Sequence, residues 1–451
     1  MNAAEQAPLA RPESDVSAAV GLVGLAGLFA WVAFARAFPA LAETFDWAVP
    51  LDTLGGRNSA LVGLLAAAIP MAAWSILVDK VHLRATTGLD WSLVRSREPD
   101  HGVTLVKLVG LWATWAIIAG LYCLCRWYWE GQYVFAIQVL AYASLPLVVL
   151  SVPYVLWIDR ALVNRRDAAW HFGALLLMRP GWDMGQIAKH WKTWIIKAFF
   201  TAFMLSITPF AFNHIVTANF AEVFARPERI ALTIIEAMFM IDVMIGTVGY
   251  IVTMRPLDAH IRSGNPLLGG WVAALICYPP IVWGILGGGR AINYEYDTAG
   301  WLHWMAGNDT LIALWGALLV VLTGIYAWAT FAFGLRFSNL TYRGVLTNGP
   351  YRFTRHPAYV SKNLFWWAAV LPFLVTSGSP VDAIRNSFFL VVVNAIYFWR
   401  AKTEEAHLLA EDPKYREYHA WMAQNGLLTA PLTRIWNRVR PQPAIAPQPA
   451  E

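Results

Sequence analysis

The sequence of 451 residues carries little charge for its length. Only 14% of its residues are Asp, Glu, Lys or Arg, whereas a typical soluble domain has ~25%. The low charge and the hydrophobic content of 58% exclude a disordered protein, a nucleic-acid-binding protein and an ordinary cytosolic enzyme. What remains is a protein that crosses a membrane several times.

Cysteine is also scarce. Cys123 and Cys125 end one apolar run and Cys277 lies inside another. Three cysteines form no disulfide framework, and a Cys-x-Cys pair without a nearby His or third Cys is a poor metal site. We therefore expect no metal. Arg11 lies in a polar segment before the first apolar run, so we expect that run to be a retained span and not a cleaved signal.

Ten apolar segments approach the length of about 20 residues that a membrane-spanning helix needs. The last two are shorter than the others and carry Asn363, Pro372 and Asn394. The segments are 16–38, 59–78, 103–125, 133–157, 193–215, 230–253, 267–287, 309–333, 361–376 and 384–399.

The positive charges alternate between the two sides of this arrangement. Both tails and the loops after even-numbered spans hold 25 of the 34 Lys and Arg residues, counting those near a span end with the adjacent loop. The other loops hold seven, and Lys107 and Lys197 lie within spans. Because Lys and Arg are retained in the cytoplasm, we predict an all-α, polytopic helical bundle with both termini cytoplasmic.

The sixth span contains two acidic residues, which are costly in a membrane and suggest function. Glu236 and Asp242 are separated by about 600° of helix rotation and point to different faces. One interpretation is that each pairs with Arg, Trp N–H or Tyr O–H in the bundle. The alternative is an ion-coupled secondary transporter, in which both acids act with a helix broken at Pro279–Pro280.

Two segments outside the spans have distinct compositions. Residues 160–192 place tryptophans beside Arg and Lys, which is typical of a segment at the membrane surface; an anchoring role and a substrate-steering role are both compatible with it. Residues 434–451 are basic and then rich in Pro, Ala and Gln, and we predict a disordered tail.

Polar residues concentrate in two C-terminal stretches, 338–363 and 397–421. In the first, Asn348-Gly349-Pro350 and His356-Pro357 break the backbone around several aromatic and basic side chains. Such a loop leaves N–H and C=O groups free for a polar ligand. In the second, Arg400 and Glu404 share one face of a helix at spacing i, i+4. A surface ion pair alone would account for this spacing equally well.

The order of these pieces resembles the isoprenylcysteine carboxyl methyltransferase family and the related phospholipid N-methyltransferases. The resemblance covers about residues 335–425. It rests on Gly-Pro-Tyr at 349–351, Arg-His-Pro-Ala-Tyr at 355–359, a hydrophobic hairpin, Arg-x-x-x-Glu-Glu at 400–405 and Tyr-x-x-Tyr at 415–418. It implies a membrane-embedded methyltransferase that uses S-adenosyl-L-methionine in a pocket facing the cytoplasm.

The resemblance also implies roles for individual residues. Arg400 would orient the acceptor and Glu404 would contact the cofactor, and these two are the expected catalytic residues. Glu405 is included with the cofactor site, and the remaining residues expected to line it are Arg343, Gly344, Val345, Leu346, Tyr351, His356, Pro357, Ala358 and Tyr359.

The expected organisation follows from the same comparison. Residues 1–300 form a membrane region of about seven spans without an assigned role, and residues 301–433 form the catalytic domain. The expected acceptor is a lipid or lipid-like molecule with a carboxylate or amine head; an amine would need a base, for which His356 and Glu405 are candidates. A membrane reductase of the sterol-reductase type is a further alternative. Membrane lipids are expected partners, nucleic acid is not, and the oligomeric state is not predicted.

Overall fold

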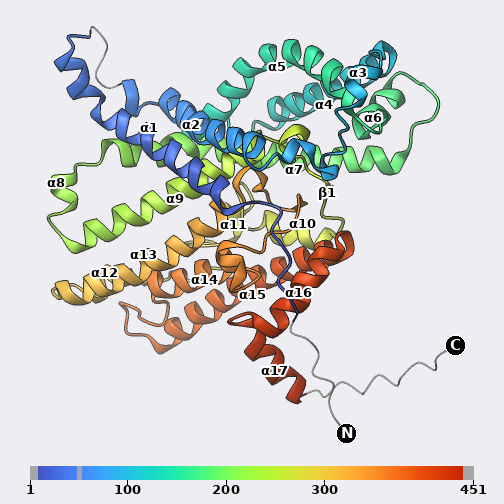
Figure 1. The fold of residues 1–451 in the computed structure, drawn as a ribbon. Helices are drawn as coiled ribbons and strands as arrows, with labels where there is room; N and C mark the ends of the chain where they lie inside the picture. Colours follow the sequence, from blue (N-terminus) through green and yellow to red (C-terminus); the bar gives the residue numbers. More distant parts are fainter. Residues whose placement is uncertain (1–8, 48–52, 440–451) are drawn as a thin grey trace.

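The structure is a computed structural model that describes residues 9–47 and 53–439. Within these ranges nearly all regular structure is helical (Figure 1). The strands β1 (Ser263–Gly264) and β2 (Thr341–Tyr342) form a short antiparallel pair with Ser263 opposite Tyr342. The prediction of an all-α, multi-pass membrane fold is confirmed.

Eight helices of the described residues are long and apolar enough to cross a membrane. Each matches one predicted span. They are α1 (Ala18–Thr44), α2 (Arg57–Leu77), α4 (His101–Cys125), α5 (Val134–Ala161), α7 (Met184–Thr217), α9 (Pro227–Ile251), α13 (Asp309–Phe331) and α15 (Pro380–Glu411).

The other two predicted spans differ from the expectation. Segment 267–287 is not one helix but two short ones, α10 (Leu268–Leu275) and α11 (Val282–Ile285), because Pro279 and Pro280 cannot continue a helix. Segment 361–376 corresponds to α14 (Pro357–Val370), whose 14 residues span about 21 Å, less than the hydrocarbon core. The total of ten spans and the side of the termini therefore stay predictions.

Shorter helices connect and flank the long ones. They are α3 (Leu93–Ser96), α6 (Ala168–Leu176), α8 (Phe220–Val223), α12 (Gly300–Trp304), α16 (Pro413–Asn425) and α17 (Thr429–Val439). The first six residues of the predicted disordered tail, 434–439, belong to α17. The rest of that tail, 440–451, lies outside the described residues.

The first 300 residues and the C-terminal region share one core. Helix α9 packs along α13, and α13 packs against α14. Leu28 of α1, Leu64 of α2 and Met244 of α9 are buried in the same cluster as Leu335 and Leu346. The helices that precede residue 300 therefore support the C-terminal region directly.

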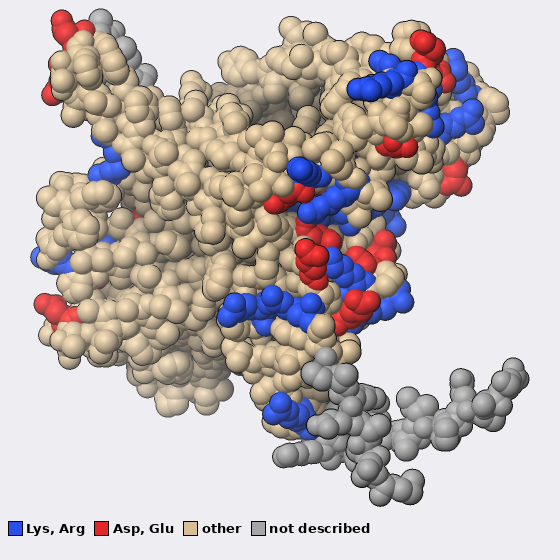
Figure 2. Space-filling view, viewed as in Figure 1, with Lys and Arg blue, Asp and Glu red and all other residues tan. Residues whose placement is uncertain are grey.

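Charged side chains gather at one end of the helices. In Figure 2, most of the Lys and Arg visible on this face lie at the right, over the ends of the molecule that carry α3, α6, β1 and α16 in Figure 1. Most of the remaining surface in this view is uncharged. This asymmetry agrees with the unequal distribution of Lys and Arg among the predicted loops.

Candidate active site

A cavity of about 170 Å³ lies among α13, α14, α15 and the segment 333–346. Ten of the twelve predicted site residues line it. These are Arg343, Gly344, Val345, Leu346, Tyr351, His356, Ala358, Tyr359, Arg400 and Glu404. Two stretches separated by about 40 residues of chain are thus brought together, whereas Pro357 and Glu405 do not line the cavity.

Arg400 and Glu404 lie one helical turn apart on α15 and form the polar centre of the cavity. The guanidinium Nε of Arg400 is 3.2 Å from Oε1 of Glu404, and its Nη2 donates to Oδ1 of Asn339. The Tyr359 hydroxyl donates to the same carboxylate oxygen of Glu404 at 2.6 Å. Arg400 is only 3% exposed, so its charge is held by these partners and not by water.

Aromatic rings surround the Arg400 guanidinium. Its Cζ lies 5.4 Å from the ring centre of Tyr278 and 5.1 Å from that of Tyr359. Tyr278 comes from the broken segment between α10 and α11, and its hydroxyl accepts a hydrogen bond from Nδ2 of Asn339 at 3.0 Å. The Pro279–Pro280 break therefore brings a tyrosine to this cavity.

Glu405 anchors the residues that directly precede α14. Its Oε1 is 2.8 Å from Nε of Arg355 and 3.0 Å from Nε2 of His356, and its Oε2 is 2.8 Å from Nζ of Lys402. Three cationic or titratable groups thus occupy one carboxylate. Pro357 is the first residue of α14, where its missing N–H costs nothing.

Arg343 is fixed by backbone carbonyl groups. Its guanidinium donates to the carbonyl oxygens of Gly249, Leu335, Phe337, Val252 and Ala259. Burial and the neighbouring charge of Arg336 lower the pKa of Arg343 from its ordinary value. The side chain expected to contact a cofactor therefore ties α9 and the loop after it to segment 335–337.

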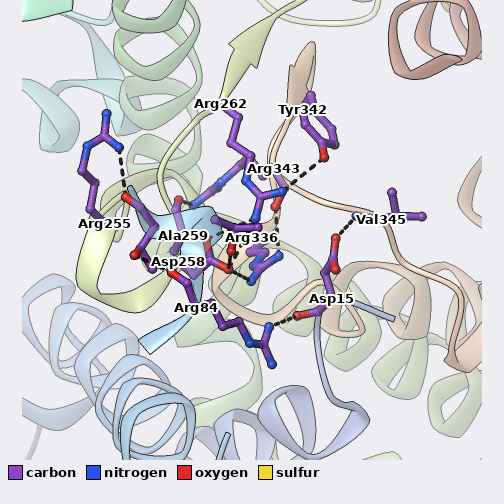
Figure 3. Close-up of polar contacts among 12 residues, drawn as sticks. Asp15, Arg84, Arg255, Asp258, Ala259, Arg262, Arg336, Tyr342, Arg343 and Val345 are labelled. Atoms are coloured by element: carbon purple, nitrogen blue, oxygen red, sulfur yellow. Dashed lines mark hydrogen bonds and ion pairs between the residues drawn. The ribbon is translucent and has the colours of Figure 1, made fainter. Parts of the chain in front are cut away.

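The carboxylate of Asp258 compensates the positive charge of two further arginines at the wall of the cavity that segment 335–346 forms (Figure 3). Asp258, which is 1% exposed, lies 2.7 Å from Nη2 of Arg336 and 3.1 Å from Nη2 of Arg262. The hydroxyl of Thr86 donates to it at 2.7 Å. The cluster thus joins the chain near residue 86, the loop after α9 and the wall of the cavity.

The segment before α1 packs on the same wall. The backbone N–H of Val345 donates to Oδ2 of Asp15 at 2.7 Å, and the N–H of Asp15 donates to the Val345 carbonyl at 2.9 Å. Burial opposes ionisation of Asp15, but hydrogen bonds from Lys414 and Val345 outweigh it and hold its pKa below the ordinary value. Gly344 has a φ of +114°, and a Cβ there would lie 2.5 Å from Nη1 of Arg336.

The side of the cavity formed by α13, α14 and α15 contains a lysine among aromatic rings. The Nζ of Lys362 lies 5.5 Å from the ring centre of Tyr326 and 5.6 Å from that of Tyr397. Asp242 of α9 accepts hydrogen bonds from the hydroxyls of Tyr326, at 3.0 Å, and Thr330. Asp242 thus pairs with a tyrosine, as one of the two interpretations predicts.

For Glu236 the same interpretation is wrong, because its partner is a histidine and its side chain is partly exposed. Its Oε2 lies 3.1 Å from Nε2 of His214, with the two side chains 38% and 50% exposed. The two acids of α9 share no hydrogen-bond partner among the described residues. The break at Pro279–Pro280 places Tyr278 in the wall of the cavity that contains Arg400. These contacts give the transporter alternative no support.

Several residues that line or support the cavity were not predicted from the sequence. Asn339 follows a long apolar helix in a polar stretch, which is the only local signal for it. Tyr278 stands directly before Pro279–Pro280, a break assigned to another function. Nothing near Asp15 or Asp258 in the chain indicates that they contact residues of the C-terminal region.

The family comparison agrees with this geometry. The cavity and its polar centre lie in a multi-pass helical membrane fold, and residues 311–410 match the model of the isoprenylcysteine carboxyl methyltransferase (ICMT) family. The match confirms the resemblance of the C-terminal region to that family and supports a membrane methyltransferase. Neither the curated proteins nor the solved structures contain a match to this chain.

Proposed function

We propose that this protein transfers a methyl group from S-adenosylmethionine to the polar head of a lipid or lipid-like acceptor, at a site that faces the cytoplasm. The observation that carries the proposal is the polar centre of Arg400, Glu404, Asn339 and Tyr359 inside the matched region. Tyr415 and Tyr418 of α16, at the end of the molecule where charge gathers, also line the cavity.

The lining residues fit the cofactor chemically. S-adenosylmethionine carries a sulfonium and an ammonium, and cations are attracted to tyrosine faces and to carboxylates. The cavity offers rings of Tyr278, Tyr326, Tyr359 and Tyr397 and the carboxylate of Glu404. These residues would hold the cofactor, which supplies a methyl group already activated for transfer.

The chain's own groups would then mainly position the acceptor. Arg400 offers a planar guanidinium, which binds carboxylate or phosphate through paired hydrogen bonds. Its contacts with Glu404 and Asn339 hold it in one orientation before an acceptor arrives. The buried setting excludes water and strengthens each of these interactions.

The contacts of the two candidate bases favour an acceptor that needs none. Glu405 is engaged by Arg355, His356 and Lys402. The Nε2 atom of His356 faces this carboxylate, which leaves only Nδ1 of that ring to take a proton from an acceptor. A carboxylate is already ionised at neutral pH, so a lipid-like carboxylic acid suits the site better than an amine.

The test is calorimetric binding of S-adenosylmethionine and S-adenosylhomocysteine to the detergent-purified protein and to Glu404→Gln. We expect micromolar binding to the wild type and a loss of at least tenfold in the variant. The neutral amide keeps the size of the side chain but removes the charge that attracts a cation.

The matched control is Glu417→Gln on α16, because Glu417 is exposed and does not line the cavity. It should bind both ligands as the wild type does. Absence of binding to folded wild-type protein, or equal affinity in Glu404→Gln and wild type, would contradict the proposal. Assay of membrane lipid extracts for methyl transfer would then identify the acceptor.

A further inference from the structure

A second cavity, of about 250 Å³, lies where the start of α7 meets the loop after α9. It shares no lining residue with the candidate active site. Five of its nine lining residues are Lys, Arg or His, and none is acidic. The nine are Ala168, Lys189, His190, Thr193, Trp194, Arg255, His260, Ile261 and Arg262.

The positive charge around this cavity exceeds the negative charge. Among the described residues, neither Lys189 nor Arg255 forms an ion pair; Arg255 donates instead to the carbonyl oxygen of Thr87 at 3.0 Å. Arg262 lies 3.1 Å from Asp258, but that carboxylate also compensates Arg336. One acid therefore serves two guanidiniums, which leaves a net positive site.

Two polar atoms of the lining are buried without a hydrogen-bond partner in the described part of the chain. They are Nε of Arg262 and Nδ1 of His260. A buried polar atom without a hydrogen-bond partner is destabilising, so native proteins usually satisfy it. Burial and the charge of Arg255, followed by that of Arg262, lower the pKa of His260 to about 2, as expected in a field of uncompensated positive charge.

We propose that this cavity binds the phosphate of an anionic phospholipid headgroup. Arginine and lysine side chains are the usual partners of phosphate oxygens. Trp194 borders the cavity, and tryptophan is enriched at the level of lipid headgroups. Lys189, His190 and Trp194 lie at the start of α7, within or beside the tryptophan-rich segment 160–192 that the composition places at the membrane surface.

The test compares vesicles of phosphatidylglycerol, vesicles of phosphatidylcholine and inorganic phosphate as ligands of the full-length purified protein. The readouts are retention of lipid in native mass spectrometry and the dissociation constant from titration. We expect phosphatidylglycerol to bind in preference to phosphatidylcholine and to raise the unfolding midpoint, since a ligand of the folded state stabilises it.

Two variants locate the site. Arg255→Gln and Lys189→Gln should each raise the dissociation constant for phosphatidylglycerol at least fivefold, and together at least tenfold. Lys189 is exposed, so its variant keeps the test valid if Arg255→Gln fails to fold. The matched control is Arg179→Gln, which removes an exposed arginine of the same segment and should leave lipid binding unchanged.

Three results would overturn the proposal. The first is equal binding of both lipids, and the second is equal loss in Arg179→Gln. The third is full occupancy by inorganic phosphate in competition with the lipid, which would assign the cavity to a soluble phosphate ligand. None of these readouts depends on methyl transfer, so this proposal and the proposed function can fail separately.

Discussion

The two walls of the candidate active site use buried arginine in different ways. In the wall formed by segment 335–346, Arg343 is bound to five backbone carbonyls and Arg336 to Asp258. In the wall formed by α15, Arg400 contacts side chains that themselves line the cavity. Arg343 and Arg400 both line the cavity, both are buried, and both were expected to contact a ligand.

The difference lies in what each set of partners can exchange. Backbone carbonyls cannot move without unfolding their helices or loops, so Arg343 is a structural cross-link. Glu404 and Asn339 are side chains that can change rotamer, so Arg400 can exchange one of these partners for a ligand. Burial and charge alone therefore do not separate the arginine proposed to bind the acceptor from the structural one; the mobility of their partners is the difference between them.

The largest expected effect comes from removing the carboxylate of Asp258, which pairs with Arg336 in the wall formed by segment 335–346. Asp258→Asn keeps the left-handed backbone (φ +48°), which Asn tolerates, but leaves Arg262 and Arg336 without their carboxylate. Loss of one partner from a buried ion pair costs about 3–5 kcal/mol. Denaturant unfolding in detergent should show this loss.

Its control is Glu222→Gln, which breaks an ion pair of 2.6 Å with Arg229 on an exposed surface. Such a pair contributes less than about 1 kcal/mol. A loss in Asp258→Asn no larger than that of the control would show that the cluster contributes little to folding.

The next largest effect is expected when Arg400 and Arg343 are each replaced by lysine, because the same substitution should affect activity in one case and stability in the other. Arg400→Lys keeps the charge but loses the paired hydrogen bonds, and it should lower kcat/KM about 100-fold, equivalent to about 2.7 kcal/mol. Arg343→Lys should instead lower the free energy of unfolding by about 1–3 kcal/mol, because it leaves carbonyls without donors. Unfolding curves and single-turnover methyl transfer measured on both variants make the comparison.

Folded Arg343→Lys should bind S-adenosylmethionine with the affinity of the wild type. If it loses binding while Arg400→Lys retains full activity, the assignment of the two walls is reversed.

The smallest expected effect is measured over the single pH unit below 6.5 and concerns His260, which follows Ala259, a carbonyl partner of Arg343. Its pKa of about 2 lies below the ordinary 6.5, so below pH 6.5 the unfolded chain takes up a proton that the folded protein does not. Stability therefore falls as the pH falls, by about 1.4 kcal/mol per pH unit from this group. The free energy of unfolding of His260→Gln should lack this part of the decline.

The exposed His303 provides the control, since His303→Gln should follow the wild type at each pH. Parallel pH profiles for His260→Gln and wild type would contradict the expected shift.

The parts of the structure that could be predicted depend on local sequence patterns. The eight long helices follow from apolar runs, because a membrane permits few other backbone structures. The grouping of segment 343–359 with Arg400 and Glu404 followed from a resemblance, and the geometry places them around one cavity. The division of 267–287 into two short helices was only half predicted, since prolines indicate a break but not whether the helix resumes.

Long-range contacts were beyond prediction from one sequence. The Val345 N–H donates to a carboxylate that lies 330 residues earlier in the chain. Asp258 reaches Arg336 across 78 residues. No periodicity or motif predicts such a pair, because the sequence around each residue is an ordinary polar one and gives no sign of its distant partner. The role of Arg343 was assigned by position alone, and its carbonyl partners could not be foreseen.

The contact between Asp15 and Val345 has a consequence for biosynthesis. Translation proceeds from the amino end, so Asp15 leaves the ribosome long before Val345 and Lys414, the two partners of its carboxylate, exist. The cavity wall can be completed only after the last long helix has been inserted. Nascent chains arrested before residue 345 should therefore expose the segment around Asp15 to proteases, and its protection would mark the end of assembly.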